Sequence, residues 1–384
     1  MPKPRVVEFD ILRAFAIIVI VCADLGYFLP TVGIPYNGLL ADFGVALFLF
    51  ISGFVLYFNH PSFSQRKSLE DFYKKRVLRI FPLYWLALVV GLFLAGVQPR
   101  FPPRIAFIII LGLQGFLSPR FGTDLMAYWW FIGVILVLYV IYPLIIALAS
   151  GTLNLPAPMK SSILEFTIML LVPFLILVAA RRAFFIIDDS VFAFYGIFVL
   201  GIAFSKYNTL DKYGFLTDNR TRLLKYFAAA AVSFTALLFL YRLKVTDFAN
   251  VSAVPHFASY GGFLIVKTAL FLLFVLLAFY LARIMVVSSS KVSRPPSRAV
   301  WYRTLLLISF SSYAIYLFFG YILVPLMYAL IGAQVTALEI SIIQIFVGLP
   351  TVVLVAYLLQ SMQNEIANRV RKYRTASVLA SDKT

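Results

Sequence analysis

Three ionisable residues interrupt the first apolar stretch of the chain, residues 8–28: Asp10, Arg13 and Asp24. A charge inside a hydrocarbon layer is costly, so it usually faces a protein interior or a wet cavity and indicates a functional site. Arg13 and Asp24 are eleven residues apart, which returns them to nearly one helix face, about 16 Å apart along the axis. The pattern therefore predicts a functional polar face. The alternative is a set of helix-end charges that reach the membrane surface or meet partners.

A second group of candidate residues lies where the chain enters a later apolar stretch. Lys75, Arg76 and Arg79 stand in the basic segment 74–79, and Pro82 follows. On a helix, Arg76 and Arg79 are neighbours three positions apart. Guanidinium groups bind phosphate oxygens in a bidentate way that ammonium groups do not. The pair is thus a candidate phosphate site, with ordinary cytoplasmic positive charge as the alternative.

Small residues form a third candidate feature, in the apolar stretch that follows Asp42. Gly44, Ser52 and Gly53 permit the close approach of another helix or of a thin ligand. Spacing alone does not separate these two roles.

The elements that must position these residues are membrane helices. The chain has 384 residues, of which 62% are apolar, 17% aromatic and only 13% charged, and its mean hydropathy is +0.95. Several stretches of about 20 apolar residues follow one another, each long enough to cross a bilayer as a helix. They lack the alternation of barrel strands. The fold class expected is an all-α polytopic membrane protein.

The net charge of +17 does not indicate nucleic-acid binding, because Lys and Arg are concentrated in particular loops and in the tail. This distribution fits the positive-inside rule and anionic lipid headgroups. Cys22 is the only cysteine, and His60 and His256 are the only histidines. We therefore expect no intrachain disulfide, no metal site and no permanently bound cofactor. The charged first helix is expected to be retained rather than cleaved as a signal peptide.

Apolar runs bounded by Pro, Gly and charge predict the elements. Eleven runs are found: 8–29, 39–58, 80–97, 105–117, 127–148, 163–180, 191–205, 226–241, 259–285, 304–330 and 336–359. Placing the basic segments 59–79, 206–225, 291–303 and the tail on the cytoplasmic side requires that one run does not cross. The shortest, 105–117, suits a re-entrant or interfacial segment.

The prediction is therefore about ten transmembrane helices with both termini cytoplasmic, in a multi-pass protein of the cytoplasmic (plasma) membrane. Residues 1–359 are expected to form one membrane domain, and residues 360–384 a basic, partly disordered cytoplasmic tail.

Five motifs in order resemble those of the acyltransferase-3 family of membrane O-acyltransferases, which modify extracytoplasmic glycans. They are Asp10-Ile-Leu-Arg13-Ala-Phe-Ala; Gly44-Val-Ala-Leu-Phe with Ile51-Ser52-Gly53-Phe54; Arg76-Val-Leu-Arg79-Ile-Phe-Pro82-Leu-Tyr84; Trp130-Phe131 with Tyr139 and Pro143; and Ser312-Tyr313-Ala-Ile-Tyr316-Leu317. Together they span residues 8 to about 320.

The resemblance implies an acyltransferase that uses cytoplasmic acyl-coenzyme A, often acetyl-coenzyme A, as its donor substrate. The acceptor would be a hydroxyl of a glycan or lipid-linked sugar on the other side of the membrane. Lys75, Arg76, Arg79, Ser52 and Gly53 would bind the donor. Position 24 and Arg13 would be catalytic, with Asp10, Trp130, Tyr139, Tyr313 and Tyr316 in support.

The chain departs from the family pattern at the position of greatest chemical interest. The family has a histidine, the expected base, where this chain has Asp24; the late motif often ends in a histidine where this chain has Phe319. Three interpretations of Asp24 stay open. It is a natural carboxylate base made effective by burial, or it indicates a natural loss of activity, or it is an engineered replacement of histidine.

Other functions remain as alternatives to acyl transfer. A transporter or flippase would use the same buried charges as a relay without a covalent product, and a silent binding protein would keep the fold without the chemistry. Lys267, inside a later apolar run, is expected to contact an acceptor, to pair with Asp24, or to reach the membrane surface.

Overall fold

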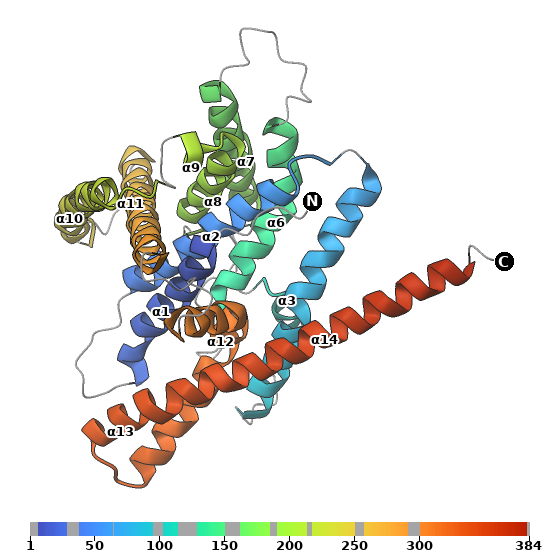
Figure 1. Cartoon of the computed structure of the whole chain (residues 1–384), viewed down its shortest axis with the longest axis vertical. Helices are drawn as coiled ribbons and strands as arrows, with labels where there is room; N and C mark the ends of the chain where they lie inside the picture. Colours follow the sequence, from blue (N-terminus) through green and yellow to red (C-terminus); the bar gives the residue numbers. More distant parts are fainter. Residues whose placement is uncertain are drawn as a thin grey trace.

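In the computed structural model the described part of the chain is helical, with no β-strand (Figure 1). The described residues are 7–28, 38–63, 65–94, 103–113, 129–149, 162–184, 190–212, 217–249, 257–290 and 300–381. The helices are α1 (Val7–Phe28), α2 (Gly38–Asn59), α3 (Arg66–Leu94), α4 (Pro103–Ile110), α6 (Trp130–Ala149), α7 (Ser162–Phe184), α8 (Ser190–Lys206), α9 (Thr209–Lys212), α10 (Arg220–Ala249), α11 (Phe257–Ser290), α12 (Val300–Gly332), α13 (Ala337–Ile343), the π-helical turn η5 (Gln344–Gly348) and α14 (Leu349–Ser381).

The all-helical membrane fold expected from the sequence is confirmed. Seven helical stretches of the described chain are long and apolar enough to cross a membrane. They lie in α2, α3, α6, α10, α11, α12 and the stretch from α13 into α14. Shorter apolar helical stretches lie in α7 (Leu164–Ile176) and α8 (Phe194–Lys206). Both the count of about ten crossings and the positions of the termini stay predictions.

The short run 105–117 begins, in the structure, as the eight-residue helix α4. A helix of this length is about 12 Å long and cannot cross a hydrocarbon core. It ends in a turn at Gly112, whose φ is +72°, a conformation that glycine adopts without steric cost. Tyr84 of α3 donates a hydrogen bond from its hydroxyl to the carbonyl of Ile109, and this ties α4 to the bundle. Residues 114–117 lie outside the described part.

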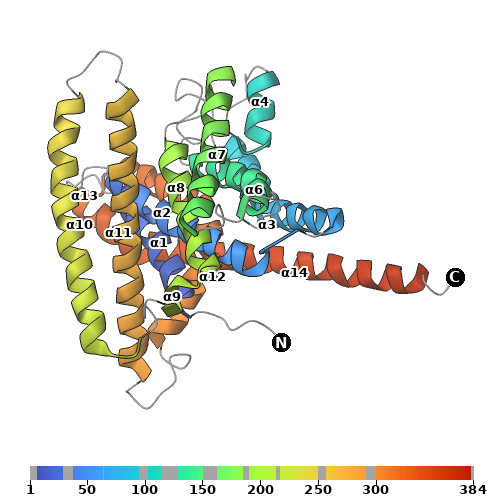
Figure 2. The same cartoon turned by 90° about the horizontal axis from the view of Figure 1, so that it is seen from above.

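The centre of the bundle is built from α1, α2, α8 and α12 (Figure 1). The helices α2 and α8 pack backbone to backbone: a Cβ on Gly53 would collide with the carbonyl oxygen of Phe198, and one on Gly201 with that of Phe50. Around this contact the interior contains many buried aromatic rings. The pair α10 and α11 lies side by side at one edge of the molecule (Figure 2).

Ion pairs join elements of the bundle at three places, centred on Arg283, Lys206 and Lys267. Arg283 of α11 binds Glu8 of α1 at 2.6 Å and Asp218, just before α10, at 2.7 Å. Lys206 at the end of α8 binds Glu165 of α7 at 2.6 Å. Each pair compensates charges that are costly to bury alone.

The third pair decides one of the sequence-based alternatives. Lys267 of α11 binds Asp42 of α2, with Nζ 2.9 Å from Oδ2. Pairing of Lys267 with Asp24 was therefore the wrong alternative. The lysine also lies over the rings of Phe194 and Phe271, at 5.9 and 5.6 Å from their centroids. Asp42 lies in the first turns of α2, where that helix faces α11. The spacing of residues along the sequence does not indicate that these two helices are neighbours.

Two helices extend beyond the boundaries expected from hydropathy. The sequence predicts a loop up to residue 79, but α3 already begins at Arg66, where an i, i+4 ion pair joins Arg66 to Glu70 at 3.0 Å. In the expected tail, residues 360–384, α14 continues as far as Ser381. The boundary of the membrane domain at residue 359 and the partly disordered tail stay predictions. Figure 2 shows α14 leaving the bundle as a long straight helix. Hydropathy identifies only the apolar segments that can contact lipid. The helix α3 has a polar segment before its apolar part, and α14 has one after it.

Candidate functional site

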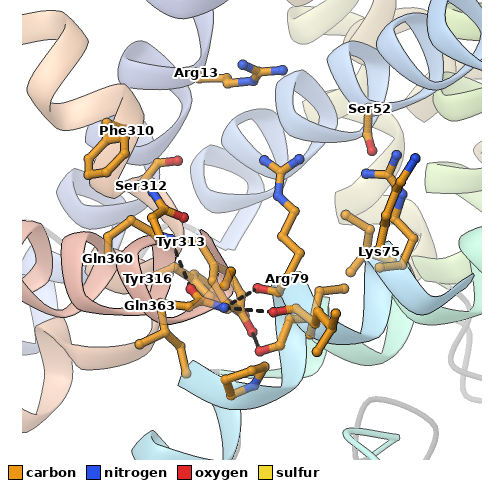
Figure 3. Close-up of a pocket in the computed structure, with 18 of the residues that line it drawn as sticks. Arg13, Ser52, Lys75, Arg79, Phe310, Ser312, Tyr313, Tyr316, Gln360 and Gln363 are labelled. Atoms are coloured by element: carbon orange, nitrogen blue, oxygen red, sulfur yellow. Dashed lines mark hydrogen bonds between the residues drawn. The ribbon is translucent and has the colours of Figure 1, made fainter. Parts of the chain in front are cut away.

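A cavity of about 1010 Å³ lies between α3, α12 and α14, with α1, α2 and α6 closing its inner side (Figure 3). Its charged lining consists of five cations and two carboxylates: Arg13, Lys74, Lys75, Arg76, Arg79, Asp10 and Asp71. Uncharged polar side chains complete the lining: Ser52, Tyr139, Ser309, Ser312, Tyr313, Tyr316, Gln360, Gln363 and Asn364. The excess of cations and hydrogen-bond donors suits an anionic ligand.

The basic segment forms one wall because it is helical. On α3, Lys75, Arg76 and Arg79 fall within five residues, close to one face. In Figure 3 the Arg79 side chain extends between Arg13 on α1 and the Lys75 and Ser52 side of the cavity. Cations from two helices far apart in sequence thus share one space.

Arg76 is held among aromatic rings. Its guanidinium carbon lies 5.3 Å from the centroid of Phe72 and 5.4 Å from that of Tyr139. Its Nε is buried and makes no hydrogen bond within the described part of the chain. A guanidinium that lies beside two aromatic rings and retains an unused donor is prepared to bind an anion.

Two polar contacts fix neighbouring parts of the wall. Tyr139 of α6 and Ser52 of α2 share a hydrogen bond of 3.1 Å between their hydroxyls. Asp10, which is 5% exposed, lies 3.7 Å from Arg13 across one helical turn. The carboxylate restrains the arginine and offsets part of its charge.

Residues at the end of the apolar part of α14 belong to this wall as well. Gln363 donates from Nε2 to the backbone carbonyls of Leu78 and Arg79, at 3.1 and 3.0 Å. Gln360 donates to Oε1 of Gln363 at 2.9 Å. The sequence-based reasoning missed both glutamines because it ended the membrane domain at residue 359. Two amides three residues apart at the end of an apolar helix were the available signal.

The structure brings most of the sequence-predicted residues together. Nine of them line the cavity: Asp10, Arg13, Ser52, Lys75, Arg76, Arg79, Tyr139, Tyr313 and Tyr316. Three lie elsewhere: Gly53 packs against α8, Trp130 packs on Phe194 at 5.5 Å between centroids, and Asp24 is not part of the lining.

Asp24 stands near the far end of α1 and is only 7% exposed. No hydrogen bond or ion pair joins its carboxylate to another residue of the described ranges. From Arg13, in the cavity wall, an ideal helix places it about 16 Å farther along α1. The cationic cavity and the position of interest for chemistry are therefore at different depths of the same helix.

Groups of histidine, cysteine and carboxylate side chains close enough to hold a metal ion are not found among the described residues. The tyrosines and arginines of the cavity are not customary ligands of divalent cations. What the lining supplies is an array of donors and positive charge.

The matched family agrees with this arrangement. No curated protein and no solved structure matches the chain. A family model described as an acyltransferase domain, acyltransferase-3, matches residues 6–360. That span includes the cavity-lining residues of α1, α2, α3, α6 and α12 and ends within α14. With so much of its length matched, the chain belongs to the acyltransferase-3 family.

Proposed function

We propose that the protein transfers an acyl group, such as acetyl, from cytoplasmic acyl-coenzyme A to a hydroxyl of an extracytoplasmic glycan or lipid-linked sugar. The observation that carries this proposal is the cavity in which Arg13, Lys74, Lys75, Arg76 and Arg79 converge. Coenzyme A carries three phosphate groups, so its binding calls for several cations in one place. The protein would act in the cytoplasmic membrane.

The cavity's size supports a ligand of this kind. Its volume of about 1010 Å³ is at the upper end of the range of about 300–1,000 Å³ for small-molecule sites. The cations gather on α3 and α1, whereas Phe48, Phe131 and Phe310 supply apolar surface elsewhere in the lining. Phosphates would lie against α3, and the acyl-bearing arm would extend along apolar surface.

The chemistry required is nucleophilic substitution at the thioester carbonyl. The acceptor oxygen forms a bond to the carbonyl carbon, the carbon–sulfur bond breaks, and coenzyme A leaves as a thiolate. The hydroxyl proton passes to a base and then to the departing sulfur. Asp24 is the base in this proposal, because its carboxylate is buried on α1 beyond the cationic cavity. The donor arm must then reach from the cavity wall toward that depth.

The separation between Asp24 and the cavity favours one second candidate, a binding protein that holds acyl-coenzyme A without turnover. Since Asp24 is not among the lining residues, a bound donor could occupy the cationic cavity and meet no base. The two candidates share the ligand and differ in the product.

Sealed inside-out membrane vesicles test the proposal. They receive acetyl-coenzyme A labelled in the acetyl group on the exposed cytoplasmic face, with the acceptor glycan inside. Label on an acceptor hydroxyl supports acyl transfer. Saturable binding without labelled glycan supports the binding protein, and accumulation of unreacted label inside the vesicles indicates transport and contradicts both.

A further inference from the structure

We propose that Gln363 is a positioning residue: its amide holds α3 at the Pro82 bend and thereby directs Arg79 and Arg76 into the cavity. The effect of Gln363 on acyl-coenzyme A binding rests on the proposed function. The contact itself is independent of any ligand, so the two ideas can fail separately.

Pro82 creates the need for an outside donor. Helix α3 continues through Pro82, which has no backbone N–H and whose ring crowds the carbonyl four residues earlier. That carbonyl belongs to Leu78, so it has no partner of the usual helical kind. An unpaired carbonyl is costly in a segment that runs into lipid.

Gln363 supplies the missing donor from another helix. Its Nε2 carries two hydrogens and lies 3.1 Å from the carbonyl oxygen of Leu78 and 3.0 Å from that of Arg79. Gln360 donates to Oε1 of Gln363 at 2.9 Å, and this bond sets which end of the amide faces α3. Both glutamine side chains are 9% exposed. The amide is therefore fully used, with both its nitrogen and its oxygen bonded.

A tyrosine from α12 continues the same contact along α3. The hydroxyl of Tyr313 donates to the carbonyl of Ile80 at 2.9 Å. Three successive carbonyls, at positions 78, 79 and 80, are thus bound by side chains of two other helices, and Figure 3 shows these bonds below the Arg79 side chain. Such a contact fixes the rotation of α3 at this point, which hydrophobic packing alone does less well.

This placement links the contact to the ligand site. Arg79 has its carbonyl bound to Gln363 while its guanidinium extends into the cavity, and Arg76 lies one turn earlier on the same helix. The positions from which both side chains reach the ligand depend on the rotation and bend of α3. Displacements of about 1 Å are enough to weaken binding or catalysis strongly.

The first test is Gln363→Met, which keeps the side chain's length and removes its donors. We expect the dissociation constant of acetyl-coenzyme A to rise about tenfold, which corresponds to the free energy of about one hydrogen bond. The matched control is Gln344→Met. Gln344 also donates from Nε2 to a backbone carbonyl, that of Leu323, at 2.7 Å, but it does not line the cavity. The Gln344→Met variant should have a lower thermal stability than the wild type and an unchanged affinity for acetyl-coenzyme A.

The second test separates positioning from simple stabilisation. Pro82→Ala restores an N–H that can bond to the Leu78 carbonyl, so Gln363→Met should cost less thermal stability in that background than in the wild type. Affinity should stay low in the double variant, because the bend that directs the arginines is gone. Unchanged affinity in Gln363→Met, or recovery of affinity together with stability in the double variant, would overturn the positioning role.

The outcome also distinguishes the two proposals. If the wild type binds no acyl-coenzyme A, the proposed function fails, while the coupling in stability between positions 82 and 363 still tests the contact. If the wild type binds and the Gln363 and Gln344 variants behave alike, the positioning role fails and the function stands.

Discussion

The guanidinium carbon of Arg76 lies 5.4 Å from the ring centroid of Tyr139, although the two residues are 63 positions apart in the chain. The ring of Phe72 lies 5.3 Å from the same atom. These rings hold the cation in place before a ligand arrives, so less conformational entropy is lost on binding. The relationship leads directly to a test of the aromatic ring.

Replacing Tyr139 by Ala should weaken acetyl-coenzyme A binding by about tenfold, since a desolvated cation–π contact is worth up to about 2 kcal/mol. Tyr139→Phe keeps the ring and loses only the hydroxyl that contacts Ser52, so its affinity should stay within about threefold of the wild type. Titration calorimetry on the detergent-solubilised protein measures both. Equal losses in the two variants would show that the hydroxyl, and not the ring, supports Arg76.

Asp24 requires its own test of chemistry. Asp24→Asn removes the basic carboxylate at nearly constant size and should reduce labelled transfer by about 100-fold or more, the usual contribution of a general base, with little change in donor affinity. Asp24→His places imidazole there and should raise transfer if the present residue is a poor base. Transfer that is unchanged in Asp24→Asn would remove the carboxylate from the mechanism.

Gly53 stands among the residues that the sequence assigns to the donor site, but the structure packs it against Phe198. Gly53→Ala should therefore lower the thermal midpoint by forcing α2 and α8 apart, while the folded protein keeps its acetyl-coenzyme A affinity. Ser52→Ala, one residue away and in the cavity lining, is the control with the opposite expectation for affinity. Weaker binding in Gly53→Ala at unchanged stability would return this glycine to the ligand site.

The ion pair between Lys267 and Asp42 predicts a non-additive effect on stability. Lys267→Met leaves a partly buried carboxylate without its cation and should cost about 3 kcal/mol or more, as breaking a buried pair usually does. Adding Asp42→Asn should restore most of that loss. Thermal unfolding of the two single variants and the double variant measures the coupling. Additive losses would show that the two charges do not depend on each other.

The sequence is informative about the helices and about the residues grouped in motifs. Apolar runs locate the membrane helices because lipid contact requires them, and the structure brings Arg13, Arg76, Arg79 and Tyr313, from three separate motifs, into the lining of one cavity. Hydropathy has no information on where a polar segment is also helical, so the apolar runs do not show that α3 begins at Arg66 or that α14 continues to Ser381.

Contacts between distant helices could not be predicted from one sequence. The partner of Lys267 is a residue 225 positions earlier, and the donor for the Leu78 carbonyl is 285 positions later. Both depend on which helices become neighbours. A proline inside a helix leaves a carbonyl without its usual donor, but only the packing of α14 identifies the residue that binds it.

The central claim is that the cations of the cavity bind the phosphates of acyl-coenzyme A, and direct titration of acetyl-coenzyme A into the purified protein tests it most directly. Arg76→Ala with Arg79→Ala should abolish measurable binding. The control is Arg66→Ala with Lys67→Ala, which removes equal charge from exposed positions of the same helix outside the cavity and should leave binding intact. Unchanged affinity in the Arg76 and Arg79 variant, or equal losses in both variants, would contradict the account.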